Sequence, residues 1–188
     1  MQYLLCCIFV ESYIKNLSSM ITTANINYLN LGNTKTYLLA SLFVLGNLVF
    51  PQLAHLIPQG GLIFLPIYFF TLIAAYKYGL FVGMLTAIFS PLINSMLFGM
   101  PPVAVLPAIM IKSVVLVLAA CLAAKHFGKV SFLGVLLAVL AYQFVGTVFE
   151  WMLTQNLHIA LQDIRLGFPG IIIQIVGGFL VLNLMSRD

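Results

Sequence analysis

The sequence predicts an all-α integral membrane protein, built as a bundle of six transmembrane helices with both termini in the cytoplasm. Of its 188 residues 63% are hydrophobic and only 6% are charged, whereas an ordinary soluble domain is about one quarter charged. The apolar residues form long runs separated by short polar segments, as expected for several membrane spans. Basic residues gather in alternate loops, which sets the orientation.

Six apolar segments follow one another along the chain. Most contain the ~20 residues needed to cross ~30 Å of hydrocarbon. The second is shorter, so we expect it to be flanked by protein, to thin the bilayer or to sit off centre. The segments cover residues 36–57, 62–76, 79–98, 103–124, 131–153 and 166–185.

These segments divide the chain into two parts. Residues 1–34 are expected to be a cytoplasmic or interfacial segment, and residues 35–188 the six-helix membrane domain. Residues 1–19 lack the basic start and the cleavage site of a signal peptide, and Met20 is an alternative start of the chain.

The loops between the segments differ in charge. Because Lys and Arg collect on the cytoplasmic side, we expect the loops at residues 58–61, 99–102 and 154–165 to face outward. The formal charge of +4 is too small and too scattered for nucleic-acid binding, and it suits loops on an anionic inner leaflet. Arg165 lies on the outer side, and five basic residues lie on the other: Lys35, Lys77, Lys125, Lys129 and Arg187.

Polar side chains concentrate in the outer halves of the expected spans, whereas the cytoplasmic halves are mainly small and aliphatic. Since an unsatisfied polar group in lipid is costly, this distribution predicts a wet cavity open to the outside. For Trp151 an interfacial anchor is the alternative role. The candidate substrate-binding residues are His55, Phe64, Tyr68, Asn94, Lys112, Gln143, Glu150 and Trp151.

Lys112 is the most informative of these residues. It lies about nine residues into the fourth span, ~14 Å deep, where inserting a lysine costs roughly 2.5–3.5 kcal/mol. Glu150 is the only acidic residue within a span and is the expected partner, although about 10 Å separates the two along the bundle axis. A ligand-binding role and a structural ion pair both remain open, and the first favours an anionic group on the ligand.

Small residues recur every fourth position along the third span. Such a stripe lets another helix approach closely, either within the protein, which is favoured, or on a partner. For partner docking the expected residues are Ala40, Gly83 and Ala120. The stripe contains Gly79, Gly83, Ala87, Pro91 and Ser95.

Catalytic and cofactor-binding patterns are absent from the sequence. There is no GxSxG, no HExxH and no P-loop, and four acidic residues offer little to a metal ion. The three cysteines have no zinc-site spacing. We therefore expect no cofactor and no metal. The alternatives are an intramembrane enzyme with His55, Lys112 and Glu150 as acid–base groups, and a structural assembly subunit.

Residues 50–102 carry motifs in a fixed order. A Pro-x-x-x-His ends the first span (Pro51 and His55), a Phe-Leu-Pro begins the second (64–66), and Ser-Pro-Leu (90–92) and Gly-Met-Pro-Pro (99–102) border the outer half of the third. In this combination the chain resembles the substrate-binding S components of energy-coupling factor (ECF) vitamin transporters. The resemblance is closest to the branch with pantothenate- and hydroxymethylpyrimidine-type members.

The chain departs from that branch at three places. Ile67 and Tyr68 stand where a Met-His pair is frequent, and Lys112 stands where a Glu is common. Val44 replaces the second alanine of the Ala-x-x-x-Ala docking pattern that begins at Ala40.

The resemblance implies a function and a set of partners. An S component of the bacterial inner membrane binds a vitamin or its precursor at an outward-facing site closed by the first outer loop. It then docks on a membrane coupling subunit driven by two cytoplasmic ATPases, and topples so that the site opens inward. The chain would supply capture and specificity without being an enzyme itself.

Overall fold

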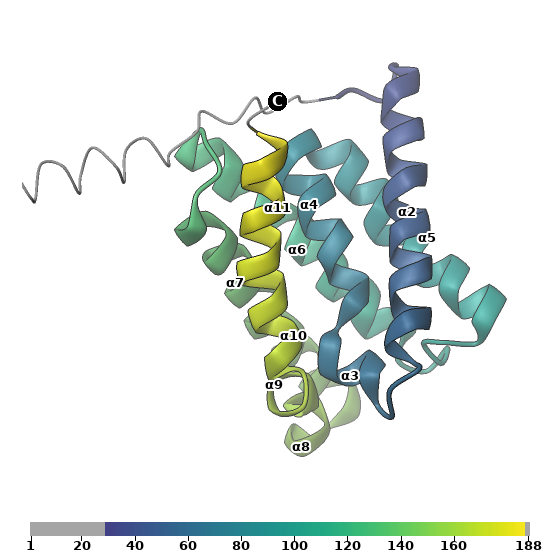
Figure 1. Cartoon of the computed structure of the whole chain (residues 1–188). Helices are drawn as coiled ribbons and strands as arrows, with labels where there is room; N and C mark the ends of the chain where they lie inside the picture. Colours follow the sequence, from purple (N-terminus) through teal and green to yellow (C-terminus); the bar gives the residue numbers. More distant parts are fainter. Residues whose placement is uncertain (1–28, 187–188) are drawn as a thin grey trace, which may run out of the picture.

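The computed structural model describes residues 29–186, and all regular secondary structure in that range is helical. The long helices lie side by side along one axis and form a single bundle (Figure 1). This confirms the predicted all-α fold class. Most of the expected N-terminal segment, residues 1–34, lies outside the described residues.

Five helical stretches among residues 29–186 are long and apolar enough to cross a membrane. They begin and end within a few residues of five of the predicted spans, which agrees with a membrane protein. The stretches are α2 (Thr34–Ala54), α5 (Leu80–Phe98), α6 (Leu106–Phe127), α7 (Phe132–Thr154) and the combined stretch Phe168–Met185.

Local sequence explains where several helices begin and end. Asn33 Oδ1 accepts a hydrogen bond from the backbone N–H of Lys35 at 3.0 Å, and Ser131 Oγ accepts one from Gly134 N at 3.5 Å. These side chains satisfy N–H groups that the first turns of α2 and α7 leave free. Helix α5 ends at Gly99, whose φ of 65° is favourable only for glycine.

The second predicted span differs most from the structure. Instead of one helix over residues 62–76, the chain forms α3 (Gly60–Phe64), a 3₁₀ turn η1 (Pro66–Tyr68) and α4 (Phe69–Tyr78). Leu65, between α3 and η1, has left-handed torsion angles of φ 46° and ψ 47°. Pro66 explains the break, because proline disfavours a right-handed helical conformation of the residue before it. The expectation of one continuous helix here is therefore wrong.

The last predicted span is continuous but contains a wider turn. It consists of α10 (Phe168–Ile172), the π-helical segment η2 (Ile173–Gly177) and α11 (Gly178–Met185). Such π segments are rare and often lie at functional sites. This one contains the buried side chain of Gln174.

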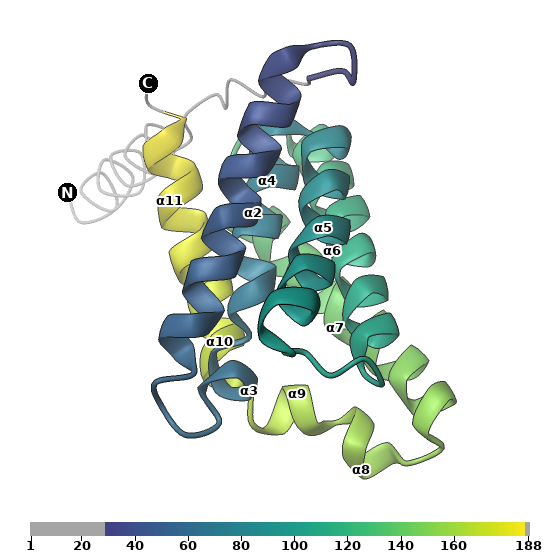
Figure 2. The same ribbon diagram turned by 90° about the vertical axis from the view of Figure 1, so that its right-hand side faces the viewer.

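The two ends of the bundle differ. The start of α2 and the end of α11 lie at one end, called here the terminal end (Figure 1). The opposite loop end carries α3, α8 (Leu157–Ala160) and α9 (Gln162–Arg165), as Figures 1 and 2 show. Arg165 belongs to the loop end, and four lysines occupy helix ends or turns of the terminal end: Lys35, Lys77, Lys125 and Lys129.

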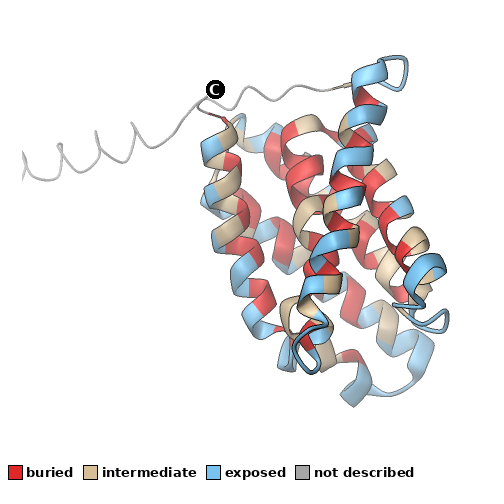
Figure 3. Cartoon of the chain, turned by 45° about the vertical axis from the view of Figure 1, so that its right-hand side comes forward, coloured by how far each residue is buried: buried red, intermediate tan, exposed pale blue. Residues whose placement is uncertain are grey.

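The interior is small and tightly packed around α4, which contacts α2, α5, α6 and α11. All residues from 71 to 77 are buried. Figure 3 shows buried positions along the inner faces of the helices and exposed positions on the outer faces. The exposed faces carry large apolar side chains such as Leu38, Leu122 and Phe144. An outer surface this apolar suits lipid contact rather than water.

The three residues predicted to dock a partner helix lie inside the bundle. A Cβ added to Gly83 would lie 2.8 Å from Ala75 Cβ of α4 and 2.9 Å from Val117 Cγ1 of α6. Ala40 and Ala120 are buried as well. Their small size lets helices of this chain approach one another. In this structure Ala40, Gly83 and Ala120 pack within the chain, which is the alternative of internal packing, and their docking role stays a prediction.

Candidate binding site

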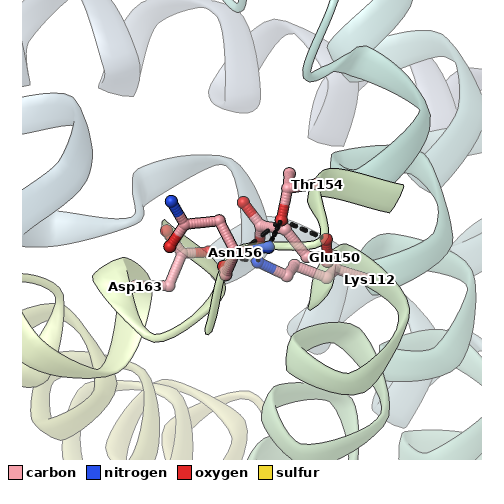
Figure 4. Close-up of polar contacts among 5 residues, drawn as sticks. All are labelled: Lys112, Glu150, Thr154, Asn156 and Asp163. Carbon is pink, nitrogen blue, oxygen red and sulfur yellow. Dashed lines mark hydrogen bonds and ion pairs between the residues drawn. The ribbon is translucent and has the colours of Figure 1, made fainter. Parts of the chain in front are cut away.

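Lys112 of α6 is the centre of the candidate site. Its side chain is only 2% exposed, and its Nζ donates hydrogen bonds to Glu150 Oε2 of α7 and to Asp163 Oδ2 of α9, the second at 2.6 Å. Figure 4 shows the lysine reaching both carboxylates. The two acids are 13% and 14% exposed. The predicted contact between Lys112 and Glu150 is thus confirmed.

A glycine on α7 makes room for the lysine. A Cβ on Gly146 would lie 2.8 Å from Lys112 Cε and 3.0 Å from Lys112 Cδ. Glu150 follows Gly146 by about one turn on the same face of α7. The methylene groups of the lysine therefore pack against α7 at Gly146, and its ammonium group lies beside the Glu150 carboxylate.

Asp163 is a partner that the sequence analysis missed. It lies in the expected outer loop, and only the folding of that loop into α8 and α9 brings it to Lys112. Thr154 Oγ1 donates to the Glu150 carbonyl at 2.8 Å, and Asn156 Oδ1 caps the first turn of α8 (Figure 4). One signal could have found it: between residues 29 and 186, Glu150 and Asp163 are the only acids in the sequence.

Several buried polar groups of α6 and α7 have no partner among the described residues. Both amide atoms of Gln143, Thr147 Oγ1 and Ser113 Oγ accept or donate no hydrogen bond there. Gln143 is 4% exposed. Gln143, Thr147 and Glu150 follow one another at spacings of four and three, so they share one face of α7. Ser113 neighbours Lys112 on α6.

Aromatic and amide groups join α7 to the irregular elements. The rings of Tyr68 and Tyr142 lie 5.0 Å apart, and Tyr142 Oη donates to Gln174 Oε1 at 2.6 Å. Gln174 Nε2 in turn donates to the carbonyl of Leu65 at 3.1 Å. Tyr142 precedes Gly146 by about one turn of α7. Tyr68, a predicted site residue, therefore lies on an inner wall beside α7.

Asn94, another predicted site residue, belongs to a different polar cluster. Its Nδ2 donates to the Asn47 carbonyl at 3.0 Å, and Gln52 Nε2 donates to its Oδ1 at 3.4 Å. Asn47 Nδ2 also donates to Thr71 Oγ1 and Ser90 Oγ. These bonds hold α2 against α5 and α4. The structure does not bring Asn94 into contact with Lys112.

The remaining three predicted residues also lie apart from the lysine. His55 is exposed at the end of α2, and Trp151 is 49% exposed on α7. Because consecutive helical residues point about 100° apart, Trp151 cannot share the direction of Glu150. Phe64 lines a mainly apolar cavity of about 300 Å³ with Phe50, Leu53, Ala54, Pro66, Phe69, Ile173 and Gln174.

The site offers little to a metal ion. No group of three or more His, Cys, Asp or Glu side chains that could hold one occurs within the described part of the chain. What the arrangement can do is bind: it combines one buried ammonium, two carboxylates and several free amide and hydroxyl groups.

Comparisons with known proteins do not place the chain in a family. No protein-family model matches it, and no curated protein or solved structure matches it. The proposals below therefore rest on the geometry of the site and on the motifs of residues 50–102.

Proposed function

We propose that the chain is the substrate-binding S component of an ECF-type importer in a bacterial inner membrane, and that it captures a vitamin or vitamin precursor at the loop end. In this proposal the chain crosses the membrane six times, with η1 and α4 as the short second crossing and both termini in the cytoplasm. The motif resemblance and the lysines at the terminal end support it.

The observation that carries the proposal is the buried, unpartnered amide of Gln143, which lies on the same face of α7 as Glu150 of the Lys112 cluster. A buried polar group left without a partner costs about 1–3 kcal/mol, and native proteins contain few of them. In a bundle with an apolar exterior, lipid cannot supply the missing hydrogen bonds. A polar small molecule held between α6, α7 and the α8–α9 segment would supply them.

Binding without turnover fits the site better than catalysis. Of the three acid–base residues of the enzyme alternative, Lys112 and Glu150 contact each other, but His55 is exposed at the end of α2. A catalytic group must reach the reacting atoms together with its partners. ATP hydrolysis and coupling would then belong to partner subunits, as the resemblance implies.

The coupling subunit would contact a surface other than the one expected from small residues. Ala40, Gly83 and Ala120 face other helices of this chain. A membrane partner would therefore use the exposed apolar faces, where residues such as Leu38 and Leu122 are accessible.

Ligand-induced stabilisation of the purified full-length chain tests the proposal. Water-soluble vitamins and precursors, including pantothenate and hydroxymethylpyrimidine, are added one at a time, and native mass spectrometry looks for a co-purified small molecule. A true ligand raises the Tm by an amount that grows with its concentration. No stabilisation and no co-purified molecule would favour the structural subunit. Turnover of a bound compound by the chain alone would favour the enzyme.

Gln143→Leu sharpens this test. Removing an unpartnered buried amide should leave the stability of the ligand-free protein unchanged or raise it, yet the ligand should then stabilise the variant less. A structural role for Gln143 predicts the reverse, namely a less stable protein with an unchanged ligand response.

A further inference from the structure

The charges around Lys112 do not balance. One ammonium group contacts two carboxylates, Glu150 and Asp163. With all three groups ionised, the cluster therefore carries one surplus negative charge. The lysine is enclosed, whereas both acids keep some contact with the surroundings at the loop end.

No other described cation compensates this surplus inside the bundle. Arg165, on the same short helix as Asp163, is exposed, and its Nη1 lies 2.5 Å from His158 Nε2. His158 and His55 are exposed as well. The four lysines other than Lys112 belong to the terminal end. The surplus negative charge thus belongs to the cluster of Lys112, Glu150 and Asp163 and does not describe the loop end as a whole.

Each carboxylate also keeps a free oxygen. Lys112 uses Glu150 Oε2 and Asp163 Oδ2, while Oε1 and Oδ1 of the same side chains form no hydrogen bond with any residue of the described range. The independent sign of a ligand is Gln143, which is buried, unpartnered and on the same face of α7 as Glu150. The site thus presents free acceptors near the loop end of α7 and, about 10 Å deeper on the same face, an amide that can donate or accept.

We propose that the ligand of this site is a small organic cation, whose ammonium or amidinium group binds the free oxygens of Glu150 and Asp163. Lys112 then positions the two acids and does not bind the ligand's charge. The inference rests on the proposed capture function and reverses the sign that Lys112 alone suggested. An anionic group approaching Lys112 would meet two carboxylates, and like charges brought together out of water repel strongly.

Probes that differ in charge test the inference on the purified full-length chain. Pyridoxamine, which carries a primary ammonium group, serves as the cation, pyridoxine as a neutral relative, and pantothenate and 4-pyridoxate as anions. We expect a cationic probe to raise the Tm and the anions to leave it unchanged. Preferential stabilisation by a neutral or anionic probe would overturn the charge inference and leave the capture function standing. No stabilisation by any probe would count against both.

Two variants locate the binding charge. Glu150→Gln and Asp163→Asn each cancel the surplus charge but leave Lys112 one carboxylate partner, so the fold should be retained. Each should weaken binding of the cationic probe about ten- to a hundredfold, the usual effect of losing a charge-assisted hydrogen bond. Unchanged affinity in both variants would remove these acids from the site and overturn the proposal.

Val103→Lys is the matched control. It adds the same unit of positive charge in the exposed loop between α5 and α6, at the same end of the bundle. Because water and salt screen exposed charges, this variant should change the affinity by less than about threefold. An equal loss in this control and in Glu150→Gln would mean that the affinity follows overall charge, which would also overturn the proposal.

Discussion

Lys112 can be enclosed in an apolar bundle because residues on α7 and α9 give it space and partners. Gly146 leaves space for its methylenes, and Glu150 and Asp163 satisfy its ammonium group. Removing an ion from water is expensive, and a buried charge is tolerated only where its partners have good geometry. The contribution of Lys112 to the stability of the fold therefore depends on both carboxylates, Glu150 and Asp163.

Lys112→Met should destabilise the protein, because it leaves two carboxylates side by side without a counterion. We expect a loss of about 3 kcal/mol, the lower end of the range for breaking a buried pair, since both acids keep some contact with water. Thermal and denaturant unfolding of the purified chain measure this loss.

The triple variant Lys112→Met, Glu150→Gln, Asp163→Asn is the control for this prediction. It removes all three charges, so most of the lost stability should return. If Lys112→Met alone left stability unchanged, the ion pairs would contribute nothing to the fold.

At the scale of elements, the π segment contacts the break in the second apolar segment through one side chain. The Leu65 carbonyl accepts two hydrogen bonds, one from Tyr68 N at 3.3 Å that closes the 3₁₀ turn and one from Gln174 Nε2 of η2 at 3.1 Å. Tyr142 of α7 donates to the oxygen of the same Gln174 amide. A helix break in a membrane protein is tolerated where neighbouring elements supply hydrogen-bond partners. Here Gln174 supplies one such partner to the break at Leu65.

Gly83→Ala tests whether the stripe of small residues packs the fold. The added methyl group would press on α4 and α6, and overpacking of this kind costs typically about 1–3 kcal/mol. We expect a lower Tm of the isolated chain. Gly32→Ala is the matched control, because a Cβ there meets no atom within 4 Å. An unchanged Tm together with lost assembly on a coupling subunit would support the docking role.

At the scale of the whole molecule, the bundle is polar inside near its loop end and apolar outside. The Lys112 cluster and the α8–α9 segment lie towards the loop end, and the lysines of the chain ends and turns lie at the terminal end. Lys and Arg near the ends of spans collect on the cytoplasmic side. This asymmetry predicts that the loop end faces outward.

Single-cysteine labelling in intact cells measures that orientation. In a background without Cys6, Cys7 and Cys121, Val103→Cys should react with a membrane-impermeant maleimide, and Lys129→Cys should react only after permeabilisation. The opposite pattern would invert the topology and place the proposed site on the cytoplasmic side.

Much of the fold could be predicted from the sequence, because lipid imposes a simple rule on each crossing. A span needs a long apolar run, and such runs gave five helices with bounds close to those observed. The second apolar segment was predicted less well. Its apolar run was visible, but the left-handed conformation at Leu65 and the hydrogen bond from Gln174 depend on a helix more than 100 residues later.

The candidate site, like the fold, could be predicted from the sequence only in part. Depth along a span pointed to Lys112, and the scarcity of acids pointed to Glu150, because both follow from the cost of a charge in lipid. The same scarcity could have pointed to Asp163, but its contact with Lys112 depends on how the outer loop folds. The position of Gly146 depends on the rotation of α7, and contacts between elements set both. Asn94, His55 and Trp151 were predicted to lie in the outer halves of their spans, where the cavity was expected, yet depth does not tell which way a side chain points.

By itself the sequence determined the all-α class, the five long apolar helices and the need for a partner at Lys112. These follow from local properties: hydrophobicity, length and the energetic cost of burying a charge. Only the tertiary structure decided that two acids share one lysine, that the small residues pack inward and that the second apolar segment is broken. These features depend on which helix faces pack against one another, and residues far apart in the sequence determine that packing jointly.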